Sequence, residues 1–333
     1  MNPRCRVVFV DRDPPSGFMQ VDRRCLEARF EVEHLVYPGS ITLPFFWRSL
    51  RAVARNDVVY VFFASEHALV PALASWAMRR RLVLIPAGYD YANVPERQYG
   101  LAARGRGWLP RLVGRLCDVA LPISRQTECE FLELVPSAAP RTWLGYLAVD
   151  PDEWSDPAVE RDLDTVVTLG YIDEEAWSRK GIDRFVEAAR TDPGRRYVLA
   201  GRITPEISRR IDRIAPPNLE RPGRLSSDDL RRLFWSAGVY AQLSWHETFG
   251  VAMAEAMLAG CVPVLGQSPA LHEVAGGWAV TVEPGEADVS AIARAAELAA
   301  TIDRHAMRED IARRFSLAQR EQRLADAVLG TFD

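Results

Sequence analysis

Short apolar runs recur along the chain and are separated by longer segments rich in alanine, leucine and arginine. The runs span residues 6–10, 32–37, 58–63, 82–88, 119–124 and 142–146, and then 165–170, 196–201, 239–244, 261–266 and 278–282. They are continuous rather than alternating, as is typical of strands buried on both faces of a parallel sheet. The pattern therefore predicts parallel strands joined by helical crossovers.

A polar segment with two prolines, residues 148–164, interrupts this alternation near the middle of the chain. The length of 333 residues also exceeds what one core usually supports and suits two domains of about 150 residues each. We therefore predict an α/β protein with two Rossmann-like, doubly wound parallel-sheet domains that face a cleft. The first covers residues 1–150 and the second 151–303, and a helical segment at 304–333 ends the chain or crosses back to the first domain.

Composition and charge exclude several classes of protein. The five cysteines are scattered and form no C-x-x-C pair, which argues against a disulfide framework and against a zinc site. A reducing, cytoplasmic location fits best. The formal net charge of −4 provides no global positive field, so nucleic acid is not an expected partner.

One segment combines aromatic and basic residues, ITLPFFWRSLRAVAR at 41–55. No stretch approaches 18 apolar residues, so no membrane-spanning helix is predicted. A helix with the composition of 41–55 either packs its apolar side inward or lies on an anionic lipid surface. In the second case the protein would be peripheral at the inner membrane face.

Three common site motifs of α/β proteins are absent from the sequence. The first apolar run is not followed by G-x-G-x-x-G, which argues against a dinucleotide bound in the Rossmann manner. The P-loop motif and G-x-S-x-G are also missing, which removes P-loop phosphate chemistry and the usual hydrolase nucleophile.

Two glutamates stand out in the loop and helix that follow the run at 239–244. Glu247 lies at the end of a predicted strand, and Glu255 follows eight residues later among apolar helix residues. A carboxylate in so apolar a helix is costly unless it is paired or faces polar groups. Hydroxyls of a sugar or ribose are suitable partners, since a carboxylate accepts two hydrogen bonds at once. A structural ion pair with an arginine is the alternative.

These glutamates belong to a longer pattern. Glu247, Phe249, Gly250 and Glu255, followed by CVPV, resemble the signature segment of retaining glycosyltransferases of family 4, which have the two-domain GT-B fold. The similarity covers about residues 165–285 and includes TLGYIDEEAWSRKGIDRFVEAAR, RYVLAGRI, PGRLSSDDLRRLFWSAGVYAQLS and PALHEVAGG. In the first half LPISRQTECEFLEL, WLGYLAVDPDEW and IPAGYDYANVPERQYG show a fainter resemblance. The resemblance implies transfer of a sugar from a nucleotide diphosphate sugar to an acceptor, with retention at the anomeric carbon and without a metal or other cofactor. It also implies that the domain at 1–150 is on the acceptor side and that the domain at 151–303 binds the nucleotide sugar.

Lys180 is the only lysine in a chain with 41 basic residues. It matches the diphosphate-binding lysine of the family, and a leaving diphosphate without a metal ion needs such fixed positive charge. The family commonly carries an arginine directly after the glycine of TLG, where this chain has Tyr171. Arg179 or Arg202 would then supply the missing charge.

The resemblance also suggests roles for the neighbouring residues. It implies that Glu247 contacts hydroxyls of the transferred sugar, that Thr248, Phe249 and Gly250 lie against sugar and diphosphate, that Glu255 binds the ribose, and that Leu225 lies beside the base.

Three residues of the first half are further candidates. Gly17 occupies the place of the family's glycine-rich loop, where a missing side chain lets phosphates approach. His67 follows a predicted strand and either touches the donor sugar or simply starts a helix. Asp90 also follows a strand and either faces the predicted cleft or serves as a turn residue.

Two other functions stay open on the sequence. One is a sugar-nucleotide epimerase of the same architecture, and the other is a non-catalytic protein that binds nucleotide sugars. The sequence does not reveal the donor base or sugar, the oligomeric state, or whether Tyr171 impairs catalysis. The acceptor is equally open among a sugar, a lipid-linked molecule and another small molecule.

Overall fold

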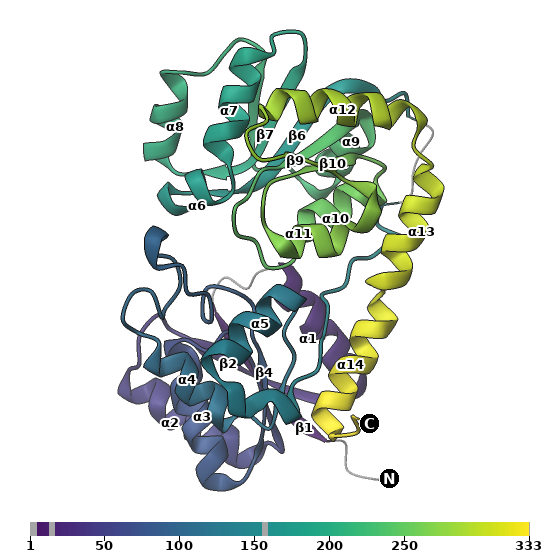
Figure 1. Ribbon diagram of the computed structural model, residues 1–333. Coiled ribbons are helices and arrows are strands. Elements are labelled where there is room, and N and C mark those ends of the chain that lie inside the picture. Colours follow the sequence, from purple (N-terminus) through teal and green to yellow (C-terminus); the bar gives the residue numbers. More distant parts are fainter. Residues whose placement is uncertain (1–4, 13–16, 155–158, 333) are drawn as a thin grey trace. The chain divides into compact units, whose positions relative to one another are not determined.

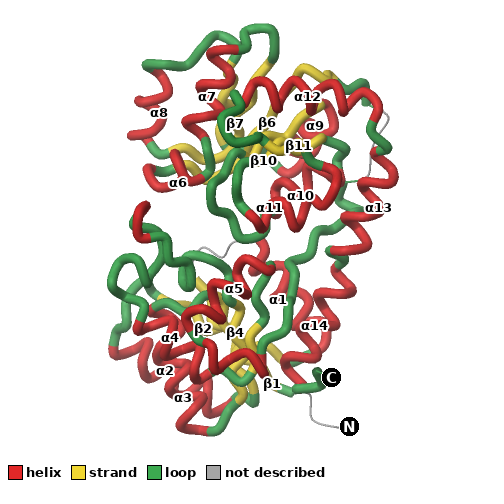
Figure 2. The backbone as a smooth tube through the Cα atoms, viewed as in Figure 1, coloured by secondary structure: helices red, strands yellow, loops and turns green. Residues whose placement is uncertain are grey.

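The computed structural model of the protein describes residues 5–12, 17–154 and 159–332. The chain forms two α/β units, Met1–Ala148 with Leu317–Asp333 as unit 1 and Val149–Ser316 as unit 2 (Figure 1). Each unit holds its own parallel sheet covered by helices, which confirms the predicted fold class (Figure 2). The expected divisions lay after residues 150 and 303, whereas the contacts divide the chain after Ala148 and Ser316.

The described residues of unit 1 form five parallel strands in the order β2-β1-β3-β4-β5. The strands are β1 (Arg6–Arg12), β2 (Glu31–Tyr37), β3 (Val58–Phe62), β4 (Arg81–Ile85) and β5 (Val119–Ala120). The helices are α1 (Gly17–Arg29), α2 (Leu43–Arg55), α3 (Glu66–Met78), α4 (Trp108–Leu116), α5 (Arg125–Leu134) and α14 (Leu317–Leu329), with 3₁₀ turns at Pro95–Arg97 and Pro136–Arg141.

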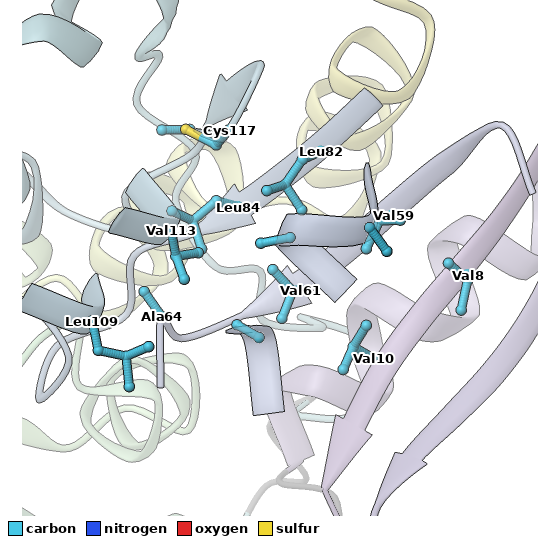
Figure 3. Packing of buried hydrophobic residues seen from close by; sticks show 14 of the residues in the cluster. Val8, Val10, Val59, Val61, Ala64, Leu82, Leu84, Leu109, Val113 and Cys117 are labelled. Carbon is cyan, nitrogen blue, oxygen red and sulfur yellow. The ribbon is translucent and has the colours of Figure 1, made fainter. Parts of the chain in front are cut away.

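Both faces of the unit 1 sheet are buried, as the continuous apolar runs predict. All five residues of β3 are buried. One face packs against α2 to α5 in a cluster that includes Val8, Val10, Val59, Val61, Leu82, Leu84, Leu109 and Val113 (Figure 3). Because side chains alternate along a strand, Tyr60 points to the other face, where it meets α1 through Asp22.

A buried ion pair fastens α14 to α1. Arg320 is 2% exposed, and its Nε donates to Asp22 Oδ1 at 2.8 Å. Its Nη1 donates to the carbonyl oxygen of Gly145 at 2.6 Å, and Tyr60 donates to the same aspartate. These bonds satisfy both buried charges. They hold α14, the last helix of the chain, in unit 1.

Unit 2, outside the undescribed residues 155–158, contains six parallel strands in the order β11-β10-β9-β6-β7-β8. The strands are β6 (Asp162–Ile172), β7 (Arg196–Ile203), β8 (Leu219–Gly223), β9 (Ala237–Gln242), β10 (Val262–Leu265) and β11 (Val280–Thr281). The helices are α6 (Glu174–Arg179), α7 (Ile182–Thr191), α8 (Pro205–Asp212), α9 (Ser227–Ser236), α10 (Val251–Leu258), α11 (Pro269–Ala275), α12 (Asp288–Thr301) and α13 (Arg304–Arg314), with a 3₁₀ turn at Gly276–Trp278.

The structure differs from the apolar pattern at two places. The run at 142–146 is not a strand. Thr142 forms an isolated bridge with Ala120, and the amides of Trp143 and Gly145 donate to the carbonyl oxygens of Ala120 and Pro122. Arg320, however, binds the carbonyl oxygens of Gly145 and Tyr146. A side chain thus takes the backbone acceptors that a neighbouring strand would need. Conversely, β8 (LERPG) is absent from the apolar runs because it is an edge strand with alternating burial.

We predict that Asp22→Asn lowers the free energy of unfolding by about 3–5 kcal/mol, because it leaves the buried Arg320 charge uncompensated. The control is Glu321→Gln, which removes an ion pair with Arg29 that joins the same two helices but whose side chains are 43% and 33% exposed. We expect that change to cost less than about 1 kcal/mol. Urea unfolding measures both values, and equal losses would contradict a special role for the buried pair.

Candidate functional site

The turn between α6 and α7 brings Lys180 to the carboxyl edge of the unit 2 sheet. Lys180 follows the last residue of α6, and Gly181 adopts the left-handed conformation at φ 66°. A Cβ atom on Gly181 would lie 2.4 Å from the carbonyl oxygen of Leu243. Only glycine therefore lets this turn pack against the segment that follows β9, which explains the Lys-Gly pair of the sequence.

Two cations converge on Glu247, which lies in the loop between β9 and α10. The Nζ atom of Lys180 is 3.5 Å from Glu247 Oε2, and Nη1 of Arg179 is 4.0 Å from the same oxygen. The side chains of Arg179 and Glu247 are each 14% exposed. The structure thus brings together three residues that the sequence analysis singled out separately.

Further contacts hold Glu247 in one orientation. Gln242 Nε2 donates to Oε2 at 3.1 Å, and the amide of Thr248 donates to Oε1 at 3.2 Å. The hydroxyl of Ser268 accepts from the Glu247 amide at 2.9 Å and donates to its carbonyl oxygen at 3.1 Å. Gln242 and Ser268 were not predicted; a glutamine within the buried run VYAQLS was the available signal for the first.

The charges around Glu247 determine its ionisation. Burial by itself would raise the pKa of this carboxyl, but the Coulombic attraction of Lys180 and then Arg179 outweighs burial, and the pKa is lowered. Glu247 is therefore ionised at neutral pH. A fixed carboxylate of this kind accepts hydrogen bonds and cannot donate one.

Two buried polar atoms near Glu247 lack a partner. Gln242 Oε1 and Ser244 Oγ have no hydrogen-bond partner in the part of the chain that the structure describes. Buried polar groups are nearly always satisfied in folded proteins. These two atoms are therefore sites at which a polar ligand can complete the hydrogen bonding.

Helix α10 begins beside Glu247 without a side-chain cap. Gly250 precedes its first residue at φ 88°, and a Cβ atom there would lie 2.6 Å from Leu271 Cδ2. Phe249 is 1% exposed and packs edge to face on Phe315 at 5.1 Å. Its ring is thus part of the core, and only its backbone is available to a ligand. Uncapped amides at a helix start attract anions.

Glu255 lies in the middle of α10 and has no ion-pair or hydrogen-bond partner among the described residues. The structural alternative, a pair with an arginine, is therefore not present. Burial, with a smaller contribution from Glu153, raises the pKa of Glu255 to about 7. The two predicted glutamates thus differ: Glu247 is compensated by cations, and Glu255 is compensated by nothing in the described chain.

Arginines gather at the ends of β7 and β8. Arg202 lies over the ring of Tyr171 at 5.8 Å and pairs with it in the sheet register. Arg202, Arg221 and Arg224 line a pocket of about 440 Å³. Leu225 follows Arg224 directly and is half-buried. Tyr171, which stands where an arginine was expected, thus contacts another arginine, Arg202, through its ring.

The candidates of the first half lie in unit 1. Asp90 is 1% exposed and accepts from the amides of Ala64 at 2.9 Å and Gly88 at 3.0 Å. His67 is fully buried, with Nε2 2.6 Å from the carbonyl oxygen of Phe62. Its predicted contact with a donor sugar stays a prediction.

Gly17 is the first residue of α1 and is exposed. A Cβ atom there would meet nothing within 4 Å, so the protein itself does not require glycine at this position. Residues 13–16 of the predicted loop lie outside the described residues.

Residues 5–12, 17–154 and 159–332 show neither a metal cluster nor a membrane span. No group of three or more His, Cys, Asp or Glu side chains there is arranged to share a metal ion. None of the described helices has the length and apolar character needed to cross a bilayer.

Comparison with known proteins finds a family match within unit 2. Residues 169–314 match the family described as Glycosyl transferases group 1. No curated protein matches the chain significantly.

Solved structures resemble the whole chain. HepE of Anabaena, crystallised with UDP and glucose, aligns with a TM-score of 0.75 at 17% identity over 98% of this chain and 100% of its own. A glycosyltransferase of Rickettsia africae ESF-5 gives 0.76 at 13% identity over 100% of both chains. Sucrose-phosphate synthase of Thermosynechococcus elongatus gives 0.69 at 16% identity over 98% of this chain and 97% of its own. The protein therefore has the GT-B fold, and the greater part of its second unit matches the group 1 glycosyl transferases.

Proposed function

We propose that the protein is a retaining, metal-independent glycosyltransferase of family 4, which moves a sugar from a nucleoside diphosphate sugar to a hydroxyl of an acceptor. The observation that carries this proposal is the convergence of Lys180 and Arg179 on the buried carboxylate of Glu247. Two cations beside an uncapped helix start form a site for a diphosphate, and this site supplies the positive charge that the anion needs.

The parts of the donor are assigned by the chemistry of unit 2. The diphosphate binds between the Lys180 ammonium and the first amides of α10, because both attract anions. Glu247 accepts hydrogen bonds from hydroxyls of the transferred sugar, and Glu255 accepts them from the ribose. The base lies toward Arg202 and Leu225 at the ends of β7 and β8.

The proposed reaction needs no protein nucleophile. The acceptor oxygen forms a bond to the anomeric carbon on the face from which the diphosphate leaves. The bond between that carbon and the diphosphate oxygen breaks, and its electron pair goes to the diphosphate. The acceptor proton passes to the departing phosphate oxygen, while Lys180 and the α10 amides stabilise the developing negative charge. For Asp90, His67 and Gly17 we keep, as part of this proposal, the roles that the family resemblance implies.

NMR-monitored turnover tests this function. We expect the protein, in EDTA, to convert one of UDP-, GDP-, ADP- or dTDP-glucose, in the presence of sugar and lipid-linked acceptors, into a glycoside that keeps the anomeric configuration of the donor. Epimerised nucleotide sugar would identify an epimerase instead. Nucleotide binding without turnover of any donor would identify a non-catalytic protein, and an inverted product or an absolute need for magnesium would contradict the proposed mechanism.

Glu255→Gln should have opposite effects on stability and on binding. The pKa of about 7 lies above the ordinary value of 4.5, so the folded protein is penalised increasingly as the pH rises through this interval and fully above it. Above pH 7 the variant should therefore unfold at a higher temperature than the wild type, because its free energy of unfolding is larger by up to about 3 kcal/mol. Near pH 4.5 the variant and the wild type should be equally stable.

The same variant should lose the thermal shift that the matching nucleoside diphosphate gives the wild type, because a bound ligand stabilises the folded state. The control is Glu297→Gln, which neutralises an exposed glutamate of α12 and should change neither property. A variant that is both unstabilised at pH 8 and fully competent in binding would contradict the role of Glu255.

We also propose that α2 rests on an anionic membrane surface. Its buried residues Phe45 and Val53 hold it to the core, while Leu43 and Trp47 are 69% and 53% exposed. Three further exposed residues, Arg48, Arg51 and Arg55, make no salt bridge within the described residues. The helix has no acidic residue. Exposed aromatic and aliphatic side chains beside uncompensated arginines favour an anionic lipid surface.

Sedimentation with vesicles tests this contact. We expect binding to phosphatidylcholine vesicles that contain one quarter phosphatidylglycerol, and weak binding to phosphatidylcholine alone. Leu43→Ser should lower the bound fraction several-fold, whereas Leu329→Ser, which changes a 53% exposed leucine of α14, should not. Equal binding to both vesicle types, or equal effects of the two substitutions, would count against the proposal.

A further inference from the structure

Unit 1 contains a pocket whose lining includes one of the predicted site residues, Asp90. It has a volume of about 420 Å³ and is lined by Tyr37, Phe63, Glu66, Tyr89, Asp90 and Arg106, among others. This volume is within the usual range for sites of small molecules. All of the described residues that line it belong to unit 1.

The position of the pocket in the sheet favours a binding role. In the order β2-β1-β3-β4-β5, the chain first moves from β1 to β2 on one side of β1 and then crosses to β3 on the other side of β1. The strand order therefore reverses its direction between β1 and β3. Ligands of open parallel sheets bind outside the carboxyl ends of strands beside such a switch point. Tyr37 ends β2, Phe63 follows β3, and Tyr89 and Asp90 follow β4, so the pocket lies at these carboxyl ends.

Backbone strain is located at the same place. Phe63 has φ 61°, a left-handed conformation that a bulky residue rarely adopts. Such strain persists only where the surrounding structure enforces it, and it is concentrated at functional sites. The conformation turns the chain sharply between the end of β3 and the start of α3, whose first residue is Glu66.

The charges in the pocket select against anions. Among the described residues that line the pocket, the only guanidinium is that of Arg106, which already pairs with Glu66. The Arg104 guanidinium lies over the Tyr89 ring, 5.4 Å from its centre, and so engages one of the two faces of that ring. The second oxygen of Glu66 accepts from the Tyr37 hydroxyl at 3.2 Å. Asp90 adds another carboxylate, which two backbone amides hold in place and which has no salt bridge in the described part of the chain. The pocket therefore offers more hydrogen-bond acceptors than unpaired positive charge.

Aromatic rings provide the apolar part of the wall. Tyr89 is fixed by an edge-to-face contact with Tyr99 at 5.2 Å, and Tyr37 is fixed in the same way by Phe45 at 5.1 Å. Rigid aromatic faces beside fixed carboxylates suit a ligand that has an apolar face and a rim of hydroxyl donors. A saccharide ring has both, whereas phosphate or carboxylate groups would meet two carboxylates.

We infer that this pocket binds a neutral saccharide ring, with the half-exposed carboxylate of Glu66 accepting hydrogen bonds from ring hydroxyls and Tyr89 packing against the apolar face of the ring. This inference rests on the proposed function only in naming that saccharide as the acceptor of the transfer. It narrows the acceptor class to a neutral sugar or a molecule that ends in one.

Saturation-transfer NMR without nucleotide tests the pocket directly. The probes are the methyl glycosides of glucose, galactose, mannose and N-acetylglucosamine, with glucuronic acid and glucose 6-phosphate as anionic comparators. We expect at least one neutral glycoside to bind and both anions to bind at least tenfold more weakly. Absence of binding by all four glycosides, or stronger binding of an anion, would overturn the inference.

Two variants localise the binding. Tyr89→Ala should weaken the neutral glycoside at least tenfold, and Tyr89→Phe, which keeps the ring, should restore most of the affinity. Trp76→Ala, which removes a 68% exposed aromatic ring of α3, should have no effect. Unchanged binding in Tyr89→Ala, with thermal melting that verifies folding, would contradict the assignment, and a Phe variant as weak as the Ala variant would do the same.

A parallel thermal-shift measurement with nucleoside diphosphates separates this inference from the proposed function. A nucleotide shift without glycoside binding would refute the saccharide pocket alone. Glycoside binding without any nucleotide shift would refute the donor site and leave the pocket as a saccharide site.

Discussion

Unit 2 must accommodate the buried negative charge of Glu247, and the arrangement of its candidate site follows from that need. A carboxylate removed from water is stable only when it is paired and hydrogen-bonded. Lys180 and Arg179 supply the positive charge, Gln242 and the Thr248 amide supply donors, and Ser268 fixes the backbone. The same need explains Gly181, since any side chain there would push Lys180 away from the end of β9.

Glu247 and Glu255 are both substantially buried, yet their environments shift their pKa values in opposite directions. The cations lower the pKa of Glu247, whereas burial raises that of Glu255 to about 7. Cations of the protein itself compensate the first, whereas the second reduces stability at neutral pH; under the proposed function, hydroxyls of a bound ribose would compensate it. Natural proteins tolerate such a cost mainly where binding or catalysis requires it.

The sequence was most informative where burial enforces a simple pattern. Continuous apolar runs predicted the buried strands of both sheets, and the fold class was confirmed. Edge strand β8 was not predicted, because only part of it is buried. The strand predicted at 142–146 was wrong, because Arg320 binds the backbone oxygens of Gly145 and Tyr146, which are 174 to 175 residues away in the chain.

The site shows the same limit. Motif spacing singled out Lys180 and Glu247, but the partner Ser268 is 21 residues beyond Glu247 and carries no motif. The roles of the site residues stay predictions, and so does the contact of Gly17 with phosphate. Long-range partners depend on tertiary packing, which periodicity and local motifs do not record.

Under the proposed function, Lys180 gives up part of its contact with Glu247 and binds the diphosphate of the donor. Calorimetric titration with a nucleoside diphosphate and with the corresponding nucleoside tests it in Lys180→Met, with Arg210→Met as the control, since Arg210 pairs with Glu174 at the surface. The account predicts that Lys180→Met weakens the diphosphate at least tenfold and leaves the nucleoside unchanged, while the control affects neither. Equal loss for both ligands, or no loss for the diphosphate, would contradict it.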